Sequence, residues 1–212
     1  CRAELKPYDN IPVLSYLMLR GRCRSCAKPI SMQYPVVELL TGLLFLAAFL
    51  LFEPPLLYQR LLFACAMIVL FVIDLEHRIL PDVITLPGIV LGLAFSVFLP
   101  PGWFDSLIGL VLGGGSLWLM GEVYFRLRHE EGMGFGDVKM LAMIGAFLGW
   151  KLMLLTLVLS SFIGSVVGVV MIVLKRGDMK YALPFGTFLA VGALVAAVAG
   201  DRIVHWYASF YY

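Results

Sequence analysis

Long apolar runs separated by short polar connections fill the chain from about residue 36 to residue 200. A helix needs about 20 apolar residues to cross a bilayer, and lipid cannot satisfy the hydrogen bonds of an open backbone, so these runs predict membrane-spanning helices. The run at 138–149 is short, which leaves open a half-helix or a span extended by its polar ends. The seven runs are 36–52, 56–73, 83–100, 105–125, 138–149, 151–174 and 183–200.

The composition agrees with this pattern. Of the 212 residues, 61% are hydrophobic and only 14% are charged, which is too apolar for a soluble domain of this size. The predicted fold class is therefore all-α, a polytopic membrane helix bundle of about seven spans in contact with membrane lipid. The net charge of +2 is small, and we expect no nucleic-acid partner.

The polar N-terminal segment differs from the rest of the chain. Residues 1–35 hold six of the sixteen basic residues and are expected to form a small cytoplasmic domain, while residues 36–212 form the membrane domain. Residue 1 is Cys rather than Met, so we expect the sequence to begin inside a longer chain.

The positions of lysine and arginine predict the orientation of the bundle. Thirteen of the sixteen lie in the N-terminal segment or near every second connection after it. Because basic connections tend to stay in the cytoplasm, this alternation predicts seven spans with the N-terminal domain on the cytoplasmic side. The three exceptions are Arg60, Lys151 and Arg202.

Three of the four cysteines, Cys1, Cys23 and Cys26, lie in the polar N-terminal segment. A C-x-x-C pair in a basic segment is more typical of metal ligands than of a disulfide framework. The alternative is a pair of reduced thiols without a metal. Cys65 lies in an apolar run and is expected to be a small packing residue.

Two acids stand where apolar runs meet connections on the predicted cytoplasmic side. Asp74 ends the second run in "VLFVIDLEHRILPDV", and Asp137 begins the fifth in "GMGFGDVKML". An acid at the bilayer centre costs about 2.5–3.5 kcal/mol on insertion scales, so acids in membrane segments usually face protein or water and have a function. Asp82 follows Pro81 and is expected to be a plain helix cap.

Two carboxyl groups brought together from different helices can share one proton, because like charges a few ångströms apart cannot both ionise. The ionised group then takes a proton from water while the protonated group polarises a peptide carbonyl. This is the chemistry of an aspartic protease. Gly134 and Gly136 would let a substrate backbone approach Asp137 closely.

Two other classes of protein also fit parts of this pattern. A proton- or cation-coupled transporter could use the paired acids, although transporters more naturally place them near mid-membrane within related halves, and the sequence has no internal repeat. A membrane-anchored zinc module that recruits partners would explain the cysteines but not Asp74 and Asp137.

The stretches "IDLEHRILPDVITLP" and "GMGFGDVKMLAMIGAFLGW" resemble the two aspartate motifs of bacterial type IV prepilin peptidases. The N-terminal "YDNIPVLSYLMLRGRCRSCAKPISMQYPVVELL" resembles the cytoplasmic domain of the same family, so the likeness covers nearly the whole chain. The resemblance implies that Asp74 and Asp137 are the catalytic pair, with Gly134 and Gly136 as the glycines of the G-x-G-D motif.

The resemblance also implies an activity, partners and a location. Members of this family cut a basic leader from prepilins or pseudopilins of type IV pili and type II secretion systems. They then methylate the new N-terminal residue with S-adenosyl-L-methionine. By this resemblance the protein is a multi-pass protein of the bacterial inner membrane whose active site faces the cytoplasm.

The family has two C-x-x-C pairs in its cytoplasmic domain. By resemblance Cys23 and Cys26 match the second pair and Cys1 matches one member of the first, with the remaining cysteine and a further membrane helix upstream. That helix would give eight spans in all. Four thiolates would suit a structural Zn²⁺ site.

Overall fold

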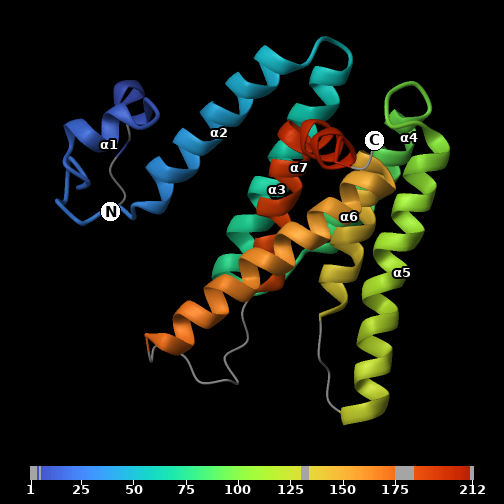
Figure 1. The fold of residues 1–212 in the computed structure, drawn as a ribbon. Coiled ribbons are helices and arrows are strands. Elements are labelled where there is room, and N and C mark those ends of the chain that lie inside the picture. Colours follow the sequence, from blue (N-terminus) through green and yellow to red (C-terminus); the bar gives the residue numbers. More distant parts are fainter. Residues whose placement is uncertain (1–3, 5, 130–133, 175–183, 211–212) are drawn as a thin grey trace. The chain divides into compact units, whose positions relative to one another are not determined.

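The computed structural model describes residues 4, 6–129, 134–174 and 184–210. In these ranges the fold is all-α, as predicted, with one isolated bridge between Arg22 and Pro29. The chain divides into two compact units, 1–51 and 52–212, and each is described by itself. The helices (Figure 1) are η1 Pro7–Asn10, α1 Leu14–Met18, α2 Gln33–Leu51, α3 Leu56–His77, α4 Asp82–Ser96, α5 Trp103–Arg128, α6 Phe135–Val173 and α7 Phe185–Ala208.

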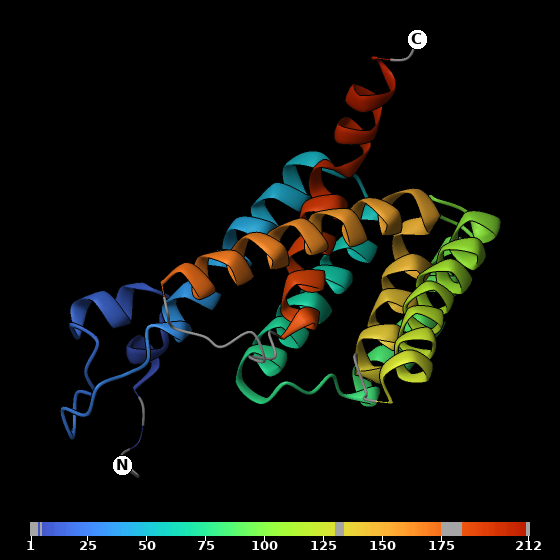
Figure 2. The ribbon, with the colours of Figure 1, turned by 60° about the horizontal axis from the view of Figure 1, so that its bottom comes forward.

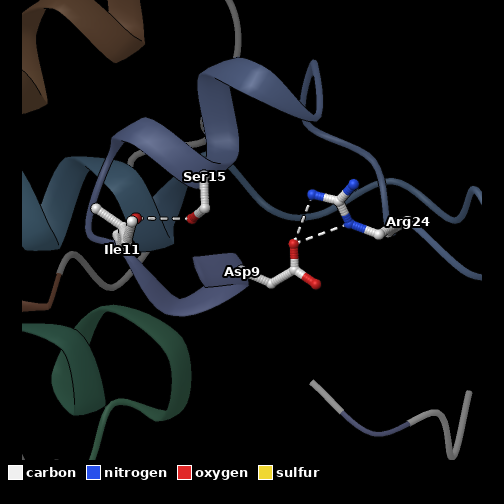
Figure 3. Close-up of polar contacts among 4 residues, drawn as sticks. All are labelled: Asp9, Ile11, Ser15 and Arg24. Atoms are coloured by element: carbon white, nitrogen blue, oxygen red, sulfur yellow. Dashed lines mark hydrogen bonds and ion pairs between the residues drawn. The ribbon is translucent and has the colours of Figure 1, made fainter. Parts of the chain in front are cut away.

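The first unit contains the polar N-terminal segment together with α2. Polar contacts hold its short elements in place, since its helices η1 and α1 contain no buried residues. Arg24 donates from Nε and Nη2 to Oδ1 of Asp9, at 2.9 and 2.7 Å, and the Ser15 hydroxyl donates to the carbonyl of Ile11 at 2.8 Å (Figure 3). The boundary of this compact unit at residue 51 follows from the inclusion of α2.

Within the described ranges, five helices are long and apolar enough to cross a bilayer: α2, α3, α5, α6 and α7. Helix α4 is also apolar but has only 15 residues. Helix α6 has 39 residues, about twice the length that one crossing needs. The seven predicted apolar runs therefore fall on six helices, and the runs 138–149 and 151–174 both lie in α6.

A break at Gly149 divides α6 into two halves. Gly149 has φ 76° and ψ 172°, a conformation that side chains disfavour, and a Cβ there would lie 2.8 Å from Cγ of Pro101. Figure 2 shows the two halves of α6 running in different directions. The short predicted run at 138–149 is therefore a half-helix that stops at Gly149.

The first half of α6 is the centre of the second unit. Every residue from Met140 to Gly149 is buried. The ring of Phe147 lies 5.2 Å from that of Phe63 on α3 and 6.4 Å from that of Phe95 on α4, measured between centroids. Helices α4, α5 and α7 all pack against α6, and α3 packs against α7. This half-helix is thus fixed by neighbours rather than by lipid.

Glycines allow α5 to pack backbone to backbone against α6. A Cβ added to Gly145 would overlap the carbonyl of Gly109, and a Cβ added to Gly113 would lie 2.7 Å from the carbonyl oxygen of Leu141. Gly109 and Gly113 are four residues apart on one face of α5, which is the small-residue spacing that lets membrane helices approach closely. Figure 1 shows α5 running alongside the first half of α6.

We expect the Gly145→Ala variant to lower the free energy of unfolding by about 1–3 kcal/mol, because the added methyl group must push α5 away from α6. The measurement is thermal unfolding of the purified protein in detergent. The control is Gly115→Ala on α5, since a Cβ at Gly115 would have no described atom within 4 Å apart from the nearby backbone of its own helix. Equal melting temperatures for the two variants would contradict this account of the packing.

Candidate active site

Asp74 and Asp137 line the same pocket. Asp74 lies in the last turn of α3, and Asp137 is the third residue of α6. The pocket has a volume of about 310 Å³, and it is lined by Asp74, Arg78, Ile79, Leu80, Asp82, Gly134, Gly136, Asp137 and Lys139.

Asp74 is held by the start of α7. Asp74 is only 5% exposed. Its Oδ2 accepts hydrogen bonds from the backbone N–H of Thr187 at 2.6 Å and from the Thr187 hydroxyl at 2.9 Å. The first N–H groups of a helix have no partner within the helix, so the carboxyl group of Asp74 satisfies one that α7 would leave unpaired. The contact joins α3 to α7.

The chain turns sharply after α3 and places Leu80 beside the acids. Arg78 adopts the left-handed conformation with φ 55°, and its N–H donates to the carbonyl of Asp74 at 2.9 Å. Leu80 is then 9% exposed and packs against two glycines. A Cβ at Gly136 would lie 2.9 Å from Cβ of Leu80, and a Cβ at Gly186 would lie 2.9 Å from its Cδ1. Leu80 thus joins the starts of α6 and α7.

The two glycines of the G-x-G-D motif have different surroundings. Among the described residues, a Cβ at Gly134 would meet Oδ2 of Asp137 at 3.7 Å, which is an ordinary contact distance. The space beside Gly136 is already taken by Leu80. The sequence interpretation gave both glycines the same purpose, but the structure places Leu80 against Gly136.

Asp82 forms an ion pair across the mouth of the pocket. Lys139 donates to both carboxyl oxygens of Asp82 at 2.7 Å, which links the start of α4 to the first turn of α6. The expectation that Asp82 is a plain helix cap was wrong: no side-chain cap is formed at the start of α4, and the side chain points to Lys139 instead. The opposite charge of Lys139 explains the difference.

Sequence reasoning missed Thr187, Gly186, Leu80 and Lys139. One signal was present for the first two. "GFGD" enters α6 and "PFGT" enters α7, so each helix begins with Phe-Gly followed by a polar residue at its third position. A polar residue at the start of a helix is common, so the second occurrence does not by itself indicate a functional site.

Cys23 and Cys26 lie on one tight loop of the first unit, where the N–H of Cys23 donates to the carbonyl of Lys28 and the N–H of Ala27 donates to the carbonyl of Cys23. Hydrogen bonds lower the pKa of the Cys23 thiol. The largest contribution comes from the backbone of Cys26, and smaller ones come from the backbone of Ser25 and the thiol of Cys26. Cys1 lies outside the described residues, and these contain no group of three or more metal-ligating side chains. Cys65 is exposed on α3 rather than packed.

Comparison with known proteins identifies the class to which this fold and site belong. The model of the type IV leader peptidase family matches residues 61–169, and that of the bacterial peptidase A24 N-terminal domain matches residues 1–52. The chain belongs to the type IV leader peptidase family, which confirms the resemblance found in the sequence. No solved structure matches significantly.

The curated relatives carry a more particular name. A prepilin leader peptidase/N-methyltransferase of Pseudomonas aeruginosa is 39% identical over 99% of this chain and 73% of its own length. Proteins of the same name from Aeromonas hydrophila and Legionella pneumophila are 40% and 37% identical, over 98% and 100% of this chain and 72% and 74% of their own lengths.

The shared pocket predicts that cysteines at the two acid positions can be cross-linked. In a Cys65→Ser background, we expect the Asp74→Cys/Asp137→Cys double variant to be joined by a short bifunctional thiol reagent. Mass spectrometry of proteolytic peptides measures the product. The control pair is Asp74→Cys with Asp105→Cys, because Asp105 lies beside Gly149 at the far end of the half-helix. Cross-linking of the control pair alone would contradict the geometry.

Proposed function

We propose that this protein cuts the leader peptide from prepilins or pseudopilins, with Asp74 and Asp137 as the catalytic pair. The observation that carries the proposal is the pocket that these two acids line together, although they come from different helices. The family membership of the chain and the name of its relatives support the same substrate class.

In this proposal a water molecule binds between the two carboxyl groups. One group, ionised, takes a proton from the water as its oxygen attacks the scissile carbonyl, and the other group donates a proton to the carbonyl oxygen. Collapse of the tetrahedral intermediate breaks the C–N bond, and a proton passes to the leaving amine. The buried surroundings of Asp74 strengthen these interactions relative to bulk water.

The substrate backbone would approach from the side of Gly134, where a Cβ would meet no described atom closer than Oδ2 of Asp137 at 3.7 Å. The acids lie at helix ends, so the scissile bond would be presented at the membrane boundary, with the basic leader outside the lipid. We assign this boundary to the cytoplasmic face of the bacterial inner membrane, because the alternation of lysine and arginine places the connections after α3 and α5 there. The assignment of residues 1–35 and 36–212 to separate domains remains a prediction.

The name of the relatives includes N-methyltransferase activity, and we propose that this chain also methylates the new N-terminus with S-adenosyl-L-methionine. This compound supplies an electrophilic methyl group to the amine. One pocket is lined by the acids, another by the cysteine loop, and a third by small and aromatic side chains such as Ser161 and Phe188. None of these linings is distinctive of a site for S-adenosyl-L-methionine. We therefore derive no methyl-transfer step from them.

We propose that Cys1, Cys23 and Cys26 are ligands of a structural Zn²⁺, with one further ligand. The described residues fit half of such a site: two thiols lie on one loop, and amide donors stabilise the thiolate of Cys23, which is the form that binds metal. The bound ion would hold the loop of residues 23–28 in its folded conformation.

The transporter alternative receives no support from the comparisons, since the curated relatives described above are named as peptidases and methyltransferases. The choice between pilus and secretion substrates depends on which prepilins share the organism with this protein. Both substrate groups would meet the same pair of acids.

We expect Asp74→Asn and Asp137→Asn each to lower kcat/KM for prepilin cleavage at least about 1,000-fold, because a neutral amide can neither take a proton from water nor share one with the second acid. The measurement is leader removal by the purified variant in detergent or lipid. Glu122→Gln is the control, since Glu122 pairs with Arg126 on an exposed face of α5. Cleavage by either asparagine variant at the normal rate would refute the role of that residue.

We expect elemental analysis of the purified full chain to find about one zinc per molecule, and Cys23→Ser or Cys26→Ser to lower that content. The Cys65→Ser variant is the matched control, because Cys65 lies in a different part of the chain on α3. If zinc is absent from the unmodified protein, or is unchanged in the Cys23→Ser variant, the cysteines are reduced thiols without a structural metal.

A further inference from the structure

We propose that Thr187 is a positioning residue that determines which oxygen of Asp74 takes part in proteolysis. The inference rests on the proposed catalytic role of Asp74. It gives the start of α7 a role in orienting Asp74. The two aspartate motifs do not indicate this role.

The hydrogen bonds of Asp74 distinguish its two carboxyl oxygens. Two donors, the N–H and the hydroxyl of Thr187, converge on Oδ2, and Oδ1 accepts no hydrogen bond within the described part of the chain. A backbone N–H can only donate, so the oxygen that it contacts at 2.6 Å must be an acceptor. A proton shared with Asp137 would therefore sit on Oδ1.

The two donors also restrict rotation of the carboxyl group of Asp74. The terminal torsion of an aspartate is broad, so one donor alone leaves the two oxygens free to exchange places. Two donors from a single residue, one from its backbone and one from its side chain, fix the plane of the group. Gly186 permits this close approach, because a Cβ there would lie 3.0 Å from Oδ2 and 3.1 Å from Cγ of Asp74.

The donors themselves lie on a buried helix. Helix α7 is buried just beyond Thr187: Leu189, Ala190 and Ala193 are all 0% exposed. Thr187 itself is 5% exposed. Donors on a buried helix hold a catalytic group more accurately than donors on a loop, so Oδ1 of Asp74 keeps one direction toward water and Asp137.

The test compares three single substitutions in cleavage of a prepilin by the purified full chain. Thr187→Val removes the hydroxyl and keeps the shape and the backbone N–H, and Thr187→Ser keeps the hydroxyl. Thr156→Val is the matched control, because Thr156 is also fully buried but donates to Leu152 within its own helix. We expect Thr187→Val to lower kcat about 10- to 100-fold with KM within about 2-fold, since a misplaced catalytic group costs rate rather than binding.

We expect Thr187→Ser and Thr156→Val to keep kcat within about 3-fold of the unmodified protein. In an Asp74→Asn background, Thr187→Val should cause no further loss, because it acts through Asp74. Three results would overturn the inference: an unchanged kcat in Thr187→Val, an equal loss in Thr187→Ser, or an equal loss in Thr156→Val. The last two would show that the effect comes from packing.

These failures differ from failure of the proposed function. If Asp74→Asn cleaves prepilin at the normal rate, the proposed catalytic role of Asp74 is wrong whatever the threonine variants do. If Asp74→Asn is inactive while Thr187→Val is fully active, the catalytic pair stands and only the role of Thr187 is rejected.

Discussion

The structure of the second unit depends on the first half of α6, in which every residue from Met140 to Gly149 is buried. Glycines on α5 remove the side chains that would hold the two helices apart, and aromatic rings of α3 and α4 close over Phe147. Dispersion forces between closely packed backbones, rather than release of water, drive such contacts in lipid. Because this half-helix cannot shift without losing them, the position of Asp137 at its first turn is set by packing far from the pocket.

The site itself is made from helix ends, where the last turn of α3 meets the starts of α4, α6 and α7. Polar groups at these ends form hydrogen bonds between helices: Thr187 donates to Asp74, and Lys139 donates to Asp82. Gathering helix ends at one boundary gives a polar pocket without placing irregular backbone in contact with lipid. In the described part of the chain, Asp74 accepts two hydrogen bonds from a neighbouring helix, α7.

The sequence indicated the fold and the two acids because both depend on local patterns. Apolar runs are visible as runs, and Asp74 and Asp137 are visible as charges at their edges. Contacts between helices are not local: nothing in the sequence says that Gly145 faces Gly109, or that Asp82 pairs with Lys139, 57 residues away. The catalytic role of the acids and the metal site remain predictions. Thr187 was missed because its importance depends on which helix end lies beside it.

The hydrogen bond between Asp74 and Thr187 joins positions 113 residues apart, and Thr187 belongs to α7, which follows α3 and α6 in the sequence. Ribosomes deliver helices in order, so α3 and α6 enter the bilayer before their partner has left the translation machinery. Until α7 inserts, Asp74 lacks both hydrogen bonds from Thr187. If Thr187 has the proposed positioning role, a nascent molecule without α7 would hold both acids but would be a poor protease.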